Sequence, residues 1–594
     1  MATVEKLITD NIDIWSSAVK AKSAVGRGSR KKLDLYGINK LRQLILELAV
    51  RGLLVSQDPN DEHASELLKK IATEKAKLIN ESKIKKQKPL LPIMDSESPF
   101  ALPQGWALAR LGDLSHMISK GTTPTSVGYA FEDTGVTFLK IENLDRGRID
   151  KSSISQFISE ETNNALARSQ LCAGDLLFSI AGTIGKTAII YDDDLPANTN
   201  QALAFIRGTS VVYSPSYLRI QLDSFVAEKT RQKARGGAMP NVSLGDLTVL
   251  VSPVPPLAEQ NRIVAKVDEL MALCDQLEQQ TETSIREHQT LVQTLLEALT
   301  NTSERDGFDQ AWSRIAKYFD TLFTTEWSID QLKQTILQLA VMGKLVPQHP
   351  NDEPASVILE KIKVEKERLV KENKITPPKV VPKIGYDEVP FNLPAGWMFT
   401  RLENLTQLIT KGSSPKWQGV SYTENPKDIL FVTSENVGVF KLRLEKKKFV
   451  EKKFNEVEPR SILKNGDYLM NIVGASIGRT AIYDIDDLAN INQAVCLIRT
   501  LPNSLCNNFL LNFFNSSICI SYMYDKQVDN ARPNLSMSNI AKFVIPVAPL
   551  AEQHRIVSKV NELMVICEQL KSHLNNSQIT KLQLADAITE QSVQ

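Results

Sequence analysis

Apolar positions along the chain follow two helical patterns and one strand pattern. Between residues 41 and 49 they recur at helical spacing, and Gly52 follows where a glycine can end a helix. The polar turn at residues 59–61 precedes a second, charged helix predicted over roughly residues 63–86. A connector interrupted by prolines then leads into a region of different character, and the same succession returns in the second half of the chain.

After Pro256 and Pro549 the apolar spacing alternates between steps of three and four residues, which is a heptad seam. It predicts two long helices that pair with each other, antiparallel if the halves are related by a two-fold axis. One amphipathic helix lying on a globular core is the alternative. The first seam is Ile263, Val267, Leu270, Cys274 and Leu277, weak through Thr281, Ser284 and His288, then resumed at Leu291 and Leu295; the second is Ile556, Val560, Leu563, Cys567, Leu570 and Leu574.

Between the helical regions, short β-rich runs alternate with turns. Examples are Val136-TFLKI, Asp175-LLFSI and Ala202-LAFIR in the first half, with Lys427-DILFVT and Ala494-VCLIR in the second. Strands mixed with turns and short helices favour an α+β fold for both globular regions.

The order of elements repeats because the sequence itself repeats. LILELAVRGLLV returns as TILQLAVMGKLV, LPQGW as LPAGW, GDLLFSIAGTIGKTAIIY as GDYLMNIVGASIGRTAIY, and PLAEQNRIVAKVDEL as PLAEQHRIVSKVNEL. The second copy follows the first at a distance of about 290 residues throughout. The chain is therefore expected to be a pseudo-dimer, which suits a partner that is itself two-fold in shape, such as duplex DNA.

These patterns divide the chain into seven predicted segments. Residues 1–32 have no clear counterpart in the second half, and they are basic (Lys20, Lys22, Arg27, Arg30, Lys31, Lys32). The segment is interpreted either as a phosphate-contacting arm or as a solvated tail. The segments are 1–40, a basic N-terminal segment; 41–102, a helical lead-in; 103–252, globular domain 1; 253–300, long helix 1; 301–393, a linker and second lead-in; 394–545, globular domain 2; and 546–594, long helix 2.

Composition narrows the class of protein. The chain of 594 residues is 42% hydrophobic, as in ordinary globular proteins, and has no apolar run of the ~20 residues that span a bilayer. Its N-terminus does not resemble a signal peptide, and six cysteines without a CxxC pair argue against a disulfide framework. A cytoplasmic protein is expected. The net charge of +1 means that any DNA-binding surface must be local.

The search for catalytic chemistry finds no strong motif. AGTIGKT resembles a phosphate-binding loop, but Ile180 stands where that motif needs its first glycine, and Arg479 replaces Lys186 in the second copy. The six histidines show no metal spacing, and neither a dinucleotide fingerprint nor a nucleophile elbow is present. Asp175 and Asp467 follow glycines at the start of apolar strands and are interpreted as turn residues. The sequence favours a binding protein.

The repeated blocks resemble the specificity (S) subunit of type I restriction-modification systems, and the long first lead-in resembles the enteric type IB branch. The blocks that carry the resemblance are AVMGKLVPQHPNDEPAS, LP-x-GW, GD-L with IG-[KR]-TAI-Y, and PLAEQ-x-RIV-x-KV-x-EL. They extend over nearly the whole chain, in the order found in that family. The resemblance implies two α+β target-recognition domains separated by an antiparallel coiled coil of the two long helices.

The resemblance also implies a function and partners. Each recognition domain would read one half of a split, asymmetric site in double-stranded DNA. The helices would hold two modification subunits, which bind S-adenosylmethionine and methylate adenine, and two restriction subunits would add ATP- and Mg-dependent translocation and cleavage. The S subunit itself would bind no cofactor or metal and catalyse nothing.

Residues shared by both copies cannot distinguish two different half-sites, so we expect them to hold phosphate or to build turns. In domain 1 these candidates are Lys120, Thr122, Asn143, Lys186, Asn200, Gln201 and Asn241; in domain 2 they are Lys411, Ser413, Asn436, Arg479, Asn492, Gln493 and Asn534. The alternative for each is a role in turn structure alone, since Asn, Gly and Pro are common in loops.

Sequence reading is expected where the copies differ, most clearly in EKTRQKARGGAMPN against SYMYDKQVDNARPN. Arg pairs bidentately with guanine and Asn with adenine, so these residue types suit base edges, although a basic helix face can also be merely solvated. The candidates are Arg231, Lys233 and Arg235 in the first copy, and Tyr524, Lys526, Asn530 and Arg532 in the second.

Two other functions remain open on the sequence. A nuclease or methyltransferase with its own active site would require a motif that the sequence does not show. A purely structural coiled-coil adaptor would leave two diverged globular domains without a purpose.

Overall fold

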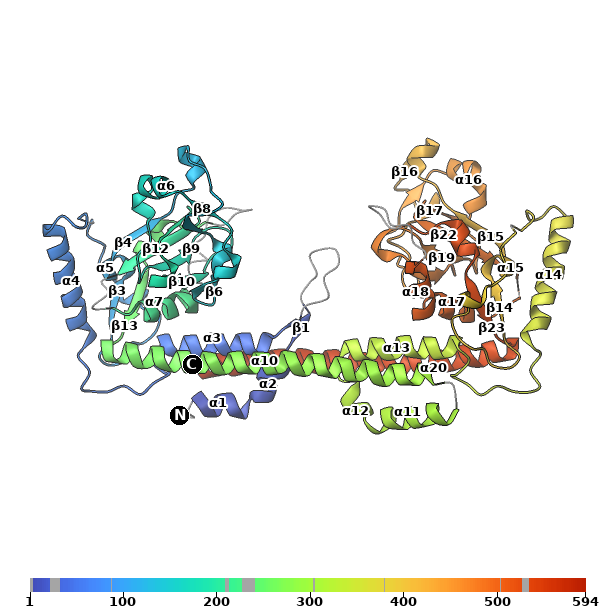
Figure 1. Cartoon of the computed structure of the whole chain (residues 1–594), viewed down its shortest axis with the longest axis horizontal. Helices are drawn as coiled ribbons and strands as arrows, with labels where there is room; N and C mark the ends of the chain where they lie inside the picture. Colours follow the sequence, from blue (N-terminus) through green and yellow to red (C-terminus); the bar gives the residue numbers. More distant parts are fainter. Residues whose placement is uncertain are drawn as a thin grey trace. The chain divides into compact units, whose positions relative to one another are not determined.

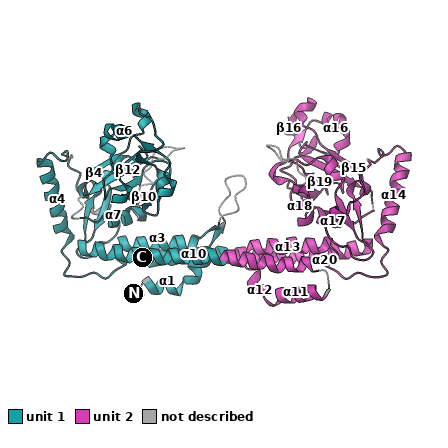
Figure 2. Ribbon diagram, in the orientation of Figure 1, with its two compact units in different colours: residues 1–284, 578–594 teal, residues 285–577 magenta. Residues whose placement is uncertain are grey.

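The chain forms two compact units in the computed structural model (Figure 2). Unit 1 is Met1–Ser284 with Gln578–Gln594, and unit 2 is Ile285–Ser577. Both contain a helical lead-in, a globular domain and parts of both long helices. The structure describes residues 4–21, 33–86, 88–208, 213–226, 241–302, 305–378, 380–502, 504–525 and 534–593.

The long helices are α10 (Leu257–Asn301) and α20 (Leu550–Val593). Unit 1 contains the start of α10 and the end of α20, whereas unit 2 contains the end of α10 and the start of α20 (Figure 1). Each unit therefore holds the beginning of one long helix with the end of the other, which is the predicted antiparallel pair.

A lead-in helix packs on the long helices in both units. In unit 1, Arg42 of α3 (Tyr36–Val50) forms an ion pair with Glu278 of α10 at 2.6 Å, and the Tyr36 hydroxyl donates to Asp586 of α20 at 2.6 Å. In unit 2, Lys571 of α20 pairs with Asp330 of α13 (Glu326–Val341) at 2.9 Å. A buried cluster in unit 2 joins α13 to both long helices.

The heptad seam is confirmed except at the end of α10. Ile263, Val267, Leu270 and Cys274 are buried, but the expected return of the seam at Leu291 is wrong because that side chain is 50% exposed. The buried positions instead begin one residue later and continue at steps of four and three: Val292, Leu296 and Leu299. An α-helix has 3.6 residues per turn, so a strict 3.5-residue pattern drifts around its surface, and here the buried stripe moves by one residue.

Glycine ends the first lead-in helix as predicted. Gly52 has a φ of +71°, and a Cβ on it would lie 2.9 Å from the ring of Trp106. The second lead-in helix, α4 (Ala64–Asn80), stops earlier than the predicted residue 86. Ser82 takes a φ of +54°, and the amide of Lys83 donates to Leu78 O at 2.9 Å, which closes the helix. In unit 2 the same element is α14 (Ala355–Lys371).

The N-terminal segment is not only a solvated tail. Residues 4–17 form α1 (Val4–Asp10) and α2 (Ile12–Ser17), and Trp15 is completely buried. The ammonium of Lys20 lies 3.7 Å from the centre of the Tyr36 ring, so this cation has a partner within the protein. The other basic residues of the expected arm, Lys22, Arg27, Arg30, Lys31 and Lys32, lie outside the described residues. Unit 2 has α11 (Arg305–Lys317) and α12 (Phe319–Leu322) before α13.

The globular domain of unit 1 is α+β, as predicted. Its main sheet is antiparallel in the order β10-β9-β12-β4, and a second sheet, β11-β5-β8, pairs β11 with β5 in parallel. Its strands are β3 (Ala107–Arg110), β4 (Ser115–Lys120), β5 (Val136–Leu139), β6 (Leu144–Asp145), β7 (Arg148–Ile149), β8 (Phe157–Ile158), β9 (Leu176–Ser179), β10 (Thr187–Ile189), β11 (Ala197–Thr199), β12 (Leu203–Gly208) and β13 (Val251–Val254); its helices are α5 (Leu111–Leu114), α6 (Glu160–Ala165), α7 (Pro215–Gln221) and α9 (Leu244–Thr248).

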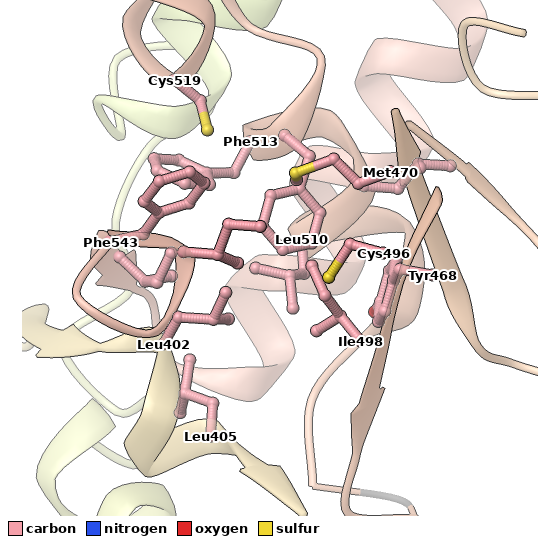
Figure 3. Close-up of a cluster of buried hydrophobic side chains, with 14 of the residues drawn as sticks. Leu402, Leu405, Tyr468, Met470, Cys496, Ile498, Leu510, Phe513, Cys519 and Phe543 are labelled. Carbon is pink, nitrogen blue, oxygen red and sulfur yellow. The ribbon is translucent and has the colours of Figure 1, made fainter. Parts of the chain in front are cut away.

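The globular domain of unit 2 repeats this arrangement, with β15-β22-β19-β20 as its main sheet. Its core packs Tyr468 and Ile498 of that sheet against Leu510 and Phe513 of a helix (Figure 3). The strands are β14 (Met398–Arg401), β15 (Thr406–Lys411), β16 (Tyr422–Thr423), β17 (Ile429–Val432), β18 (Phe449–Val450), β19 (Tyr468–Asn471), β20 (Thr480–Ile482), β21 (Ala489–Ile491), β22 (Val495–Thr500) and β23 (Val544–Val547); the helices are α15 (Leu402–Leu405), α16 (Lys453–Val457), α17 (Asn507–Phe514), α18 (Ser517–Asp525) and α19 (Met537–Ala541).

The repeated sequence blocks hold each globular domain against the start of its long helix through side-chain hydrogen bonds and ion pairs. In unit 1 the indole of Trp106, from LPQGW, donates to Glu259 at 3.0 Å, in the first turn of α10. Gln260 beside it accepts from the amide of Ser214 at 3.2 Å, and Arg262 pairs with Asp61 of the polar turn at 2.6 Å. Three blocks far apart in sequence therefore meet at the start of α10.

Unit 2 repeats these contacts at the start of α20. Trp397 donates to Glu552 at 3.1 Å, and Arg555 pairs with Asp352 at 2.5 Å. Burial raises the pKa of both glutamates, Glu259 and Glu552. The recurrence of these motifs is thus explained by packing within each unit.

Candidate nucleic-acid interface

Several loops of the unit 1 domain meet at one end of its main sheet. Strand pairing sets Lys120 beside Ala204 and Leu203 beside Ser179, so the loops that follow β4 and β9 lie at the same end as the loop that precedes β12. Backbone hydrogen bonds join these loops, from Ile180 to Ala202 O at 2.9 Å and from Val242 to Ile180 O at 2.9 Å. We call residues 120–124, 180–186, 199–202 and Asn241 loop edge 1.

Unit 2 builds the same edge from equivalent loops. Lys411 lies beside Cys496, and Asn471 lies beside Val495. The amide of Ile472 donates to Ala494 O at 3.0 Å, and the amide of Leu535 donates to Ile472 O at 3.0 Å. We call residues 411–415, 472–479, 492–494 and Asn534 loop edge 2.

A glycine in each edge allows two loops to approach closely. A Cβ on Gly121 would lie 1.8 Å from Thr199 O, and one on Gly412 would lie 1.9 Å from Ile491 O. No side chain fits at either position without moving the backbone. This contact explains the repeated K-G-[ST]-[ST]-P motif and fixes the positions of the lysines that precede each glycine.

The predicted basic residues of the two edges differ in their surroundings. Lys186 is exposed, but its ammonium donates to Leu144 O at 3.0 Å, so it also holds the neighbouring loop in place. Arg479, its counterpart, is exposed, and its side chain has no hydrogen bond or ion pair with the residues that the structure describes. Lys120 is half-buried and Lys411 is exposed. All four cations lie on the loop edges.

The predicted amides of the second pair of loops divide into a turn residue and an exposed residue. The side-chain oxygens of Asn200 and Asn492 each accept from the backbone amide two residues later, at 3.1 Å, which is turn chemistry. Gln201 and Gln493 are exposed. Gln201 accepts a hydrogen bond from the Thr123 hydroxyl within loop edge 1.

Three predicted contact residues face the protein and are withdrawn. Asn143 and Asn436 are only 3% and 4% exposed. Their side chains bond to backbone within their own loops, for example from Asn143 to Ser153 O at 2.9 Å and from Asn436 to Arg443 O at 3.0 Å. Ser413 is also buried and accepts from Gln418 at 2.9 Å. Burial and hydrogen bonding within their own loops favour the turn role that the sequence left open for them.

The remaining candidates lie at or beside the edges where they are described. Thr122 is half-buried in loop edge 1, and its amide donates to Thr199 O at 3.1 Å. Asn241 and Asn534 are exposed and bridge to Ala181 and Val473 of the adjacent loops.

Tyr524 is 45% exposed on α18, a helix that also approaches loop edge 2, since a Cβ on Gly478 would lie 3.2 Å from the sulfur of Met523. The other candidates for base reading, Arg231, Lys233, Arg235, Lys526, Asn530 and Arg532, lie outside the described residues.

Sequence reasoning missed an ion pair in each main sheet, at the end opposite the loop edge. Asp175, completely buried, accepts from Arg207 at 2.7 and 2.5 Å and from the amide of Cys172 at 2.8 Å. Asp467 and Arg499 repeat the pair at 2.6 Å. The available signal was that Gly-Asp and Ile-Arg both recur in the two copies. The pairs account for both aspartates structurally.

No group of three or more His, Cys, Asp or Glu side chains placed to hold a metal ion occurs among the residues that the structure describes. Within the same residues, no helix is long and apolar enough to cross a membrane. What the edges present is a set of exposed cations and amides on paired loops, the groups that contact phosphates and base edges in DNA-binding proteins.

Comparison with known proteins agrees with a duplicated DNA-recognition domain. The type I restriction modification DNA specificity domain family matches residues 103–287 and 394–580. The type I restriction enzyme EcoEI specificity subunit of Escherichia coli is 37% identical over 605 residues, covering 99% of this chain and 99% of that protein. The EcoAI specificity subunit of Escherichia coli is 36% identical over 618 residues and covers 100% of both.

Among solved structures, the HsdS subunit from Thermoanaerobacter tengcongensis aligns with a TM-score of 0.39 and 19% identity, covering 84% of this chain and 99% of that chain. The family match over both globular domains defines a protein with two DNA-specificity domains. The chain belongs to the family of type I restriction-modification specificity subunits.

Proposed function

We propose that each globular domain reads one half of a bipartite, asymmetric DNA site through its loop edge. By doing so the chain directs adenine methylation by modification subunits and, with restriction subunits, ATP-dependent cleavage. One observation carries the proposal. The same arrangement of strands and loops in the globular domains, which we call the frame, occurs twice, and the side chains that it presents at the two edges differ. A duplicated frame with two different reading surfaces is suited to two different half-sites separated by a fixed gap.

Within each edge, charge and position suggest a division of labour. Lysine or arginine occurs at the same place in both edges, as Lys120 with Lys411 and Lys186 with Arg479. Cations common to both domains cannot distinguish two sequences, so we assign them to phosphate contacts that set the position of each domain on the duplex. Gln201, Gln493, Asn241 and Asn534 are also common to both domains, so we assign them to the same positioning role. Base reading is assigned to Tyr524 and to the candidates that lie outside the described residues.

The partners would bind the exposed apolar positions of the long helices. Leu273 of α10 and Ile566 of α20, at matching places in the repeat, are 48% and 44% exposed. Leu291 and Leu584 form a second matching pair, 50% and 44% exposed. Each unit therefore presents one residue from each pair, Leu273 with Leu584 in unit 1 and Ile566 with Leu291 in unit 2. Exposed apolar positions repeated in this way suit two copies of one partner, the modification subunit.

The chemistry would belong to these partners. S-adenosylmethionine would be held by the two modification subunits, and ATP and Mg by the two restriction subunits, with no cofactor on this chain. A complex that acts on cellular DNA would work in the cytoplasm.

Methylome sequencing of cells that carry this chain with its modification subunit tests the reading function. We expect methylated adenines in one bipartite, non-palindromic motif with a gap of constant length. A palindrome, a continuous motif or the absence of methylation would contradict the proposal.

The docking surface has a separate test. Leu273→Asp together with Ile566→Asp should abolish co-purification of the modification subunit. Val364→Asp should not, although Val364 is more exposed, at 57%, because it lies on α14. Retention of two modification subunits by the double variant would show that they bind elsewhere. The chain expressed without its partner should be poorly soluble, and a soluble, monodisperse monomer would argue against the surface.

A further inference from the structure

The turn that follows each loop edge carries an unassigned difference between the two domains. In unit 2 this turn is η9 (Pro415–Gln418), and it carries Lys416 and Trp417. In unit 1 it is η2 (Pro124–Val127), where Thr125 and Ser126 occupy the same places. The indole of Trp417 is 75% exposed, which makes it the most exposed tryptophan among the residues that the structure describes.

The backbone of the two turns is the same, so the difference lies in the side chains. In both, proline begins the turn and a glycine with a left-handed φ ends it, +88° at Gly128 and +65° at Gly419. The amide of Ser126 donates to Thr123 O at 3.0 Å, and that of Trp417 donates to Ser414 O at 3.0 Å. Trp417 is therefore presented by a frame that unit 1 also builds, but with serine in place of tryptophan.

The turn of unit 2 is held firmly beneath the indole. The side-chain amide of Gln418 donates to Ser413 at 2.9 Å and to Glu458 at 2.7 Å, and Glu458 is buried. The indole of Trp417 has no hydrogen bond or ring contact with any residue in the described parts of the chain. A rigid base with a projecting aromatic side chain is an arrangement that loses little conformational entropy on binding.

We propose that Trp417 makes an apolar contact with a base pair of the half-site read by unit 2, and that Lys416 contacts the adjacent phosphate. This inference rests on the proposed function. Solitary exposed apolar residues are common on protein surfaces. Three observations distinguish this one: it adjoins loop edge 2, its turn is fixed by Gln418, and the matching position differs in the other domain. Apolar groups, aromatic rings among them, contact the thymine methyl group in the major groove.

The two roles predict different salt dependences. The experiment uses the full chain with its modification subunit, a duplex that carries the methylated motif, and an unrelated duplex. Trp417→Ala should weaken binding to the target about tenfold, from the typical ~1–3 kcal/mol of one specific base contact, and should leave both the unrelated duplex and the salt slope unchanged. Lys416→Ala should weaken binding to both duplexes and lower the salt slope by about one.

Methylome sequencing of the Trp417→Ala complex gives the positional test. Sequence preference should relax within one half-site only and remain intact in the other. Trp417→Phe should retain most of the preference, and Trp312→Ala should bind as wild type, since Trp312 is 44% exposed on α11, outside both globular domains. Equal loss of affinity for both duplexes, or wild-type affinity and methylome, would overturn the assignment.

The test remains interpretable if alanine disturbs the turn. Trp417→Ser installs the residue that unit 1 carries on the same backbone, and its thermal unfolding should match wild type. Failure of the wild-type complex to methylate a bipartite motif would contradict the proposed function, whereas a normal wild-type motif with an unaffected Trp417→Ser complex would contradict only this inference.

Discussion

The two units agree in the contacts that build the frame and differ in the side chains at its edge. Trp106 and Trp397 donate to equivalent glutamates at 3.0 and 3.1 Å, whereas the turns beside the two loop edges carry Ser126 in one unit and Trp417 in the other. Within one chain, the repeat thus acts as an internal control. Contacts present twice identify what the fold requires, and unmatched side chains on a matched backbone identify where the domains can read different DNA.

The largest expected effect is the loss of stability when a side chain is added at the glycine of either loop edge. Gly121→Ala and Gly412→Ala should each cost about 4 kcal/mol or more, because the new Cβ would lie within 2 Å of a backbone oxygen, at 1.8 and 1.9 Å. Thermal unfolding of the complex measures both. Gly208→Ala is the control, since its Cβ would meet nothing nearer than 4.0 Å. A cost in only one unit would mean that the edges are not equivalent.

The buried aspartates should show a somewhat smaller and equal effect. Asp175→Asn leaves Arg207 without its carboxylate, and Asp467→Asn does the same to Arg499. We expect a loss of about 3 kcal/mol for each, near the low end for breaking a buried pair, because the arginine side chains remain 26% and 15% exposed. Chemical denaturation gives the two values, and a difference above about 1 kcal/mol between them would contradict the equivalence of the frames.

One difference between the units lies inside the frame and predicts a pH effect. Asp223 of unit 1, which accepts from the Thr187 hydroxyl at 2.6 Å, stands where unit 2 has Asn515 beside Thr480. Burial raises the pKa of Asp223 to about 6, from an ordinary 3.8. A carboxyl whose pKa is higher in the folded state lowers stability above about pH 6, and this cost disappears as the pH falls toward 4.

Asp223→Asn should therefore stabilise the protein by about 2 kcal/mol at pH 8, with the gain shrinking as the pH approaches 4. Unfolding of both proteins across this range measures the gain. Asn515→Asp should introduce the same pH dependence into unit 2. A gain that does not change with pH would show that the pKa of Asp223 is not raised in the folded protein.

The smallest expected effect compares the two edge cations. Lys186→Ala and Arg479→Ala should each reduce affinity for any duplex several-fold and lower the salt slope by about one, as expected for loss of one phosphate contact. Arg479 should matter slightly more, because Lys186 already donates to Leu144 O. Binding titrations at several salt concentrations test this, and a change in the methylated motif would instead assign these residues to base reading.

The sequence predicted the lead-in helices, the strands β5, β9, β12, β17 and β22, and both long helices, because each depends on local spacing of apolar residues. It did not predict α1 and α2 in the N-terminal segment. It did not predict which residues meet across the fold. The Asp175–Arg207 pair and the Trp106–Glu259 bond join positions that are distant in the chain, and local patterns do not encode such partners. The shift of the seam at Leu291 was missed because a heptad template assumes a constant register.

For the candidate site, the sequence located the loops better than the side chains. Lys186, Arg479, Gln493 and Asn534 are exposed on the edges, whereas Asn143 and Ser413 are buried. Polar residues in loops look alike in sequence whether they face solvent or cap a turn, so only the structure separates them. Trp417 gives no signal in the sequence, because a single changed residue stands out only once the structure shows that the two turns share one backbone.

The most direct test of the central claim replaces one reading domain by the other. Residues 394–545 are exchanged for a second copy of residues 103–252, and the chimera is expressed with the modification subunit for methylome sequencing. Both units make the same hydrogen bond between the globular domain and its long helix, through Trp106 and Trp397. The chimera should therefore assemble and methylate a motif that carries the half-site of unit 1 on both sides of the gap. An assembled chimera that still methylates the wild-type asymmetric motif would contradict the claim that each domain reads its own half-site.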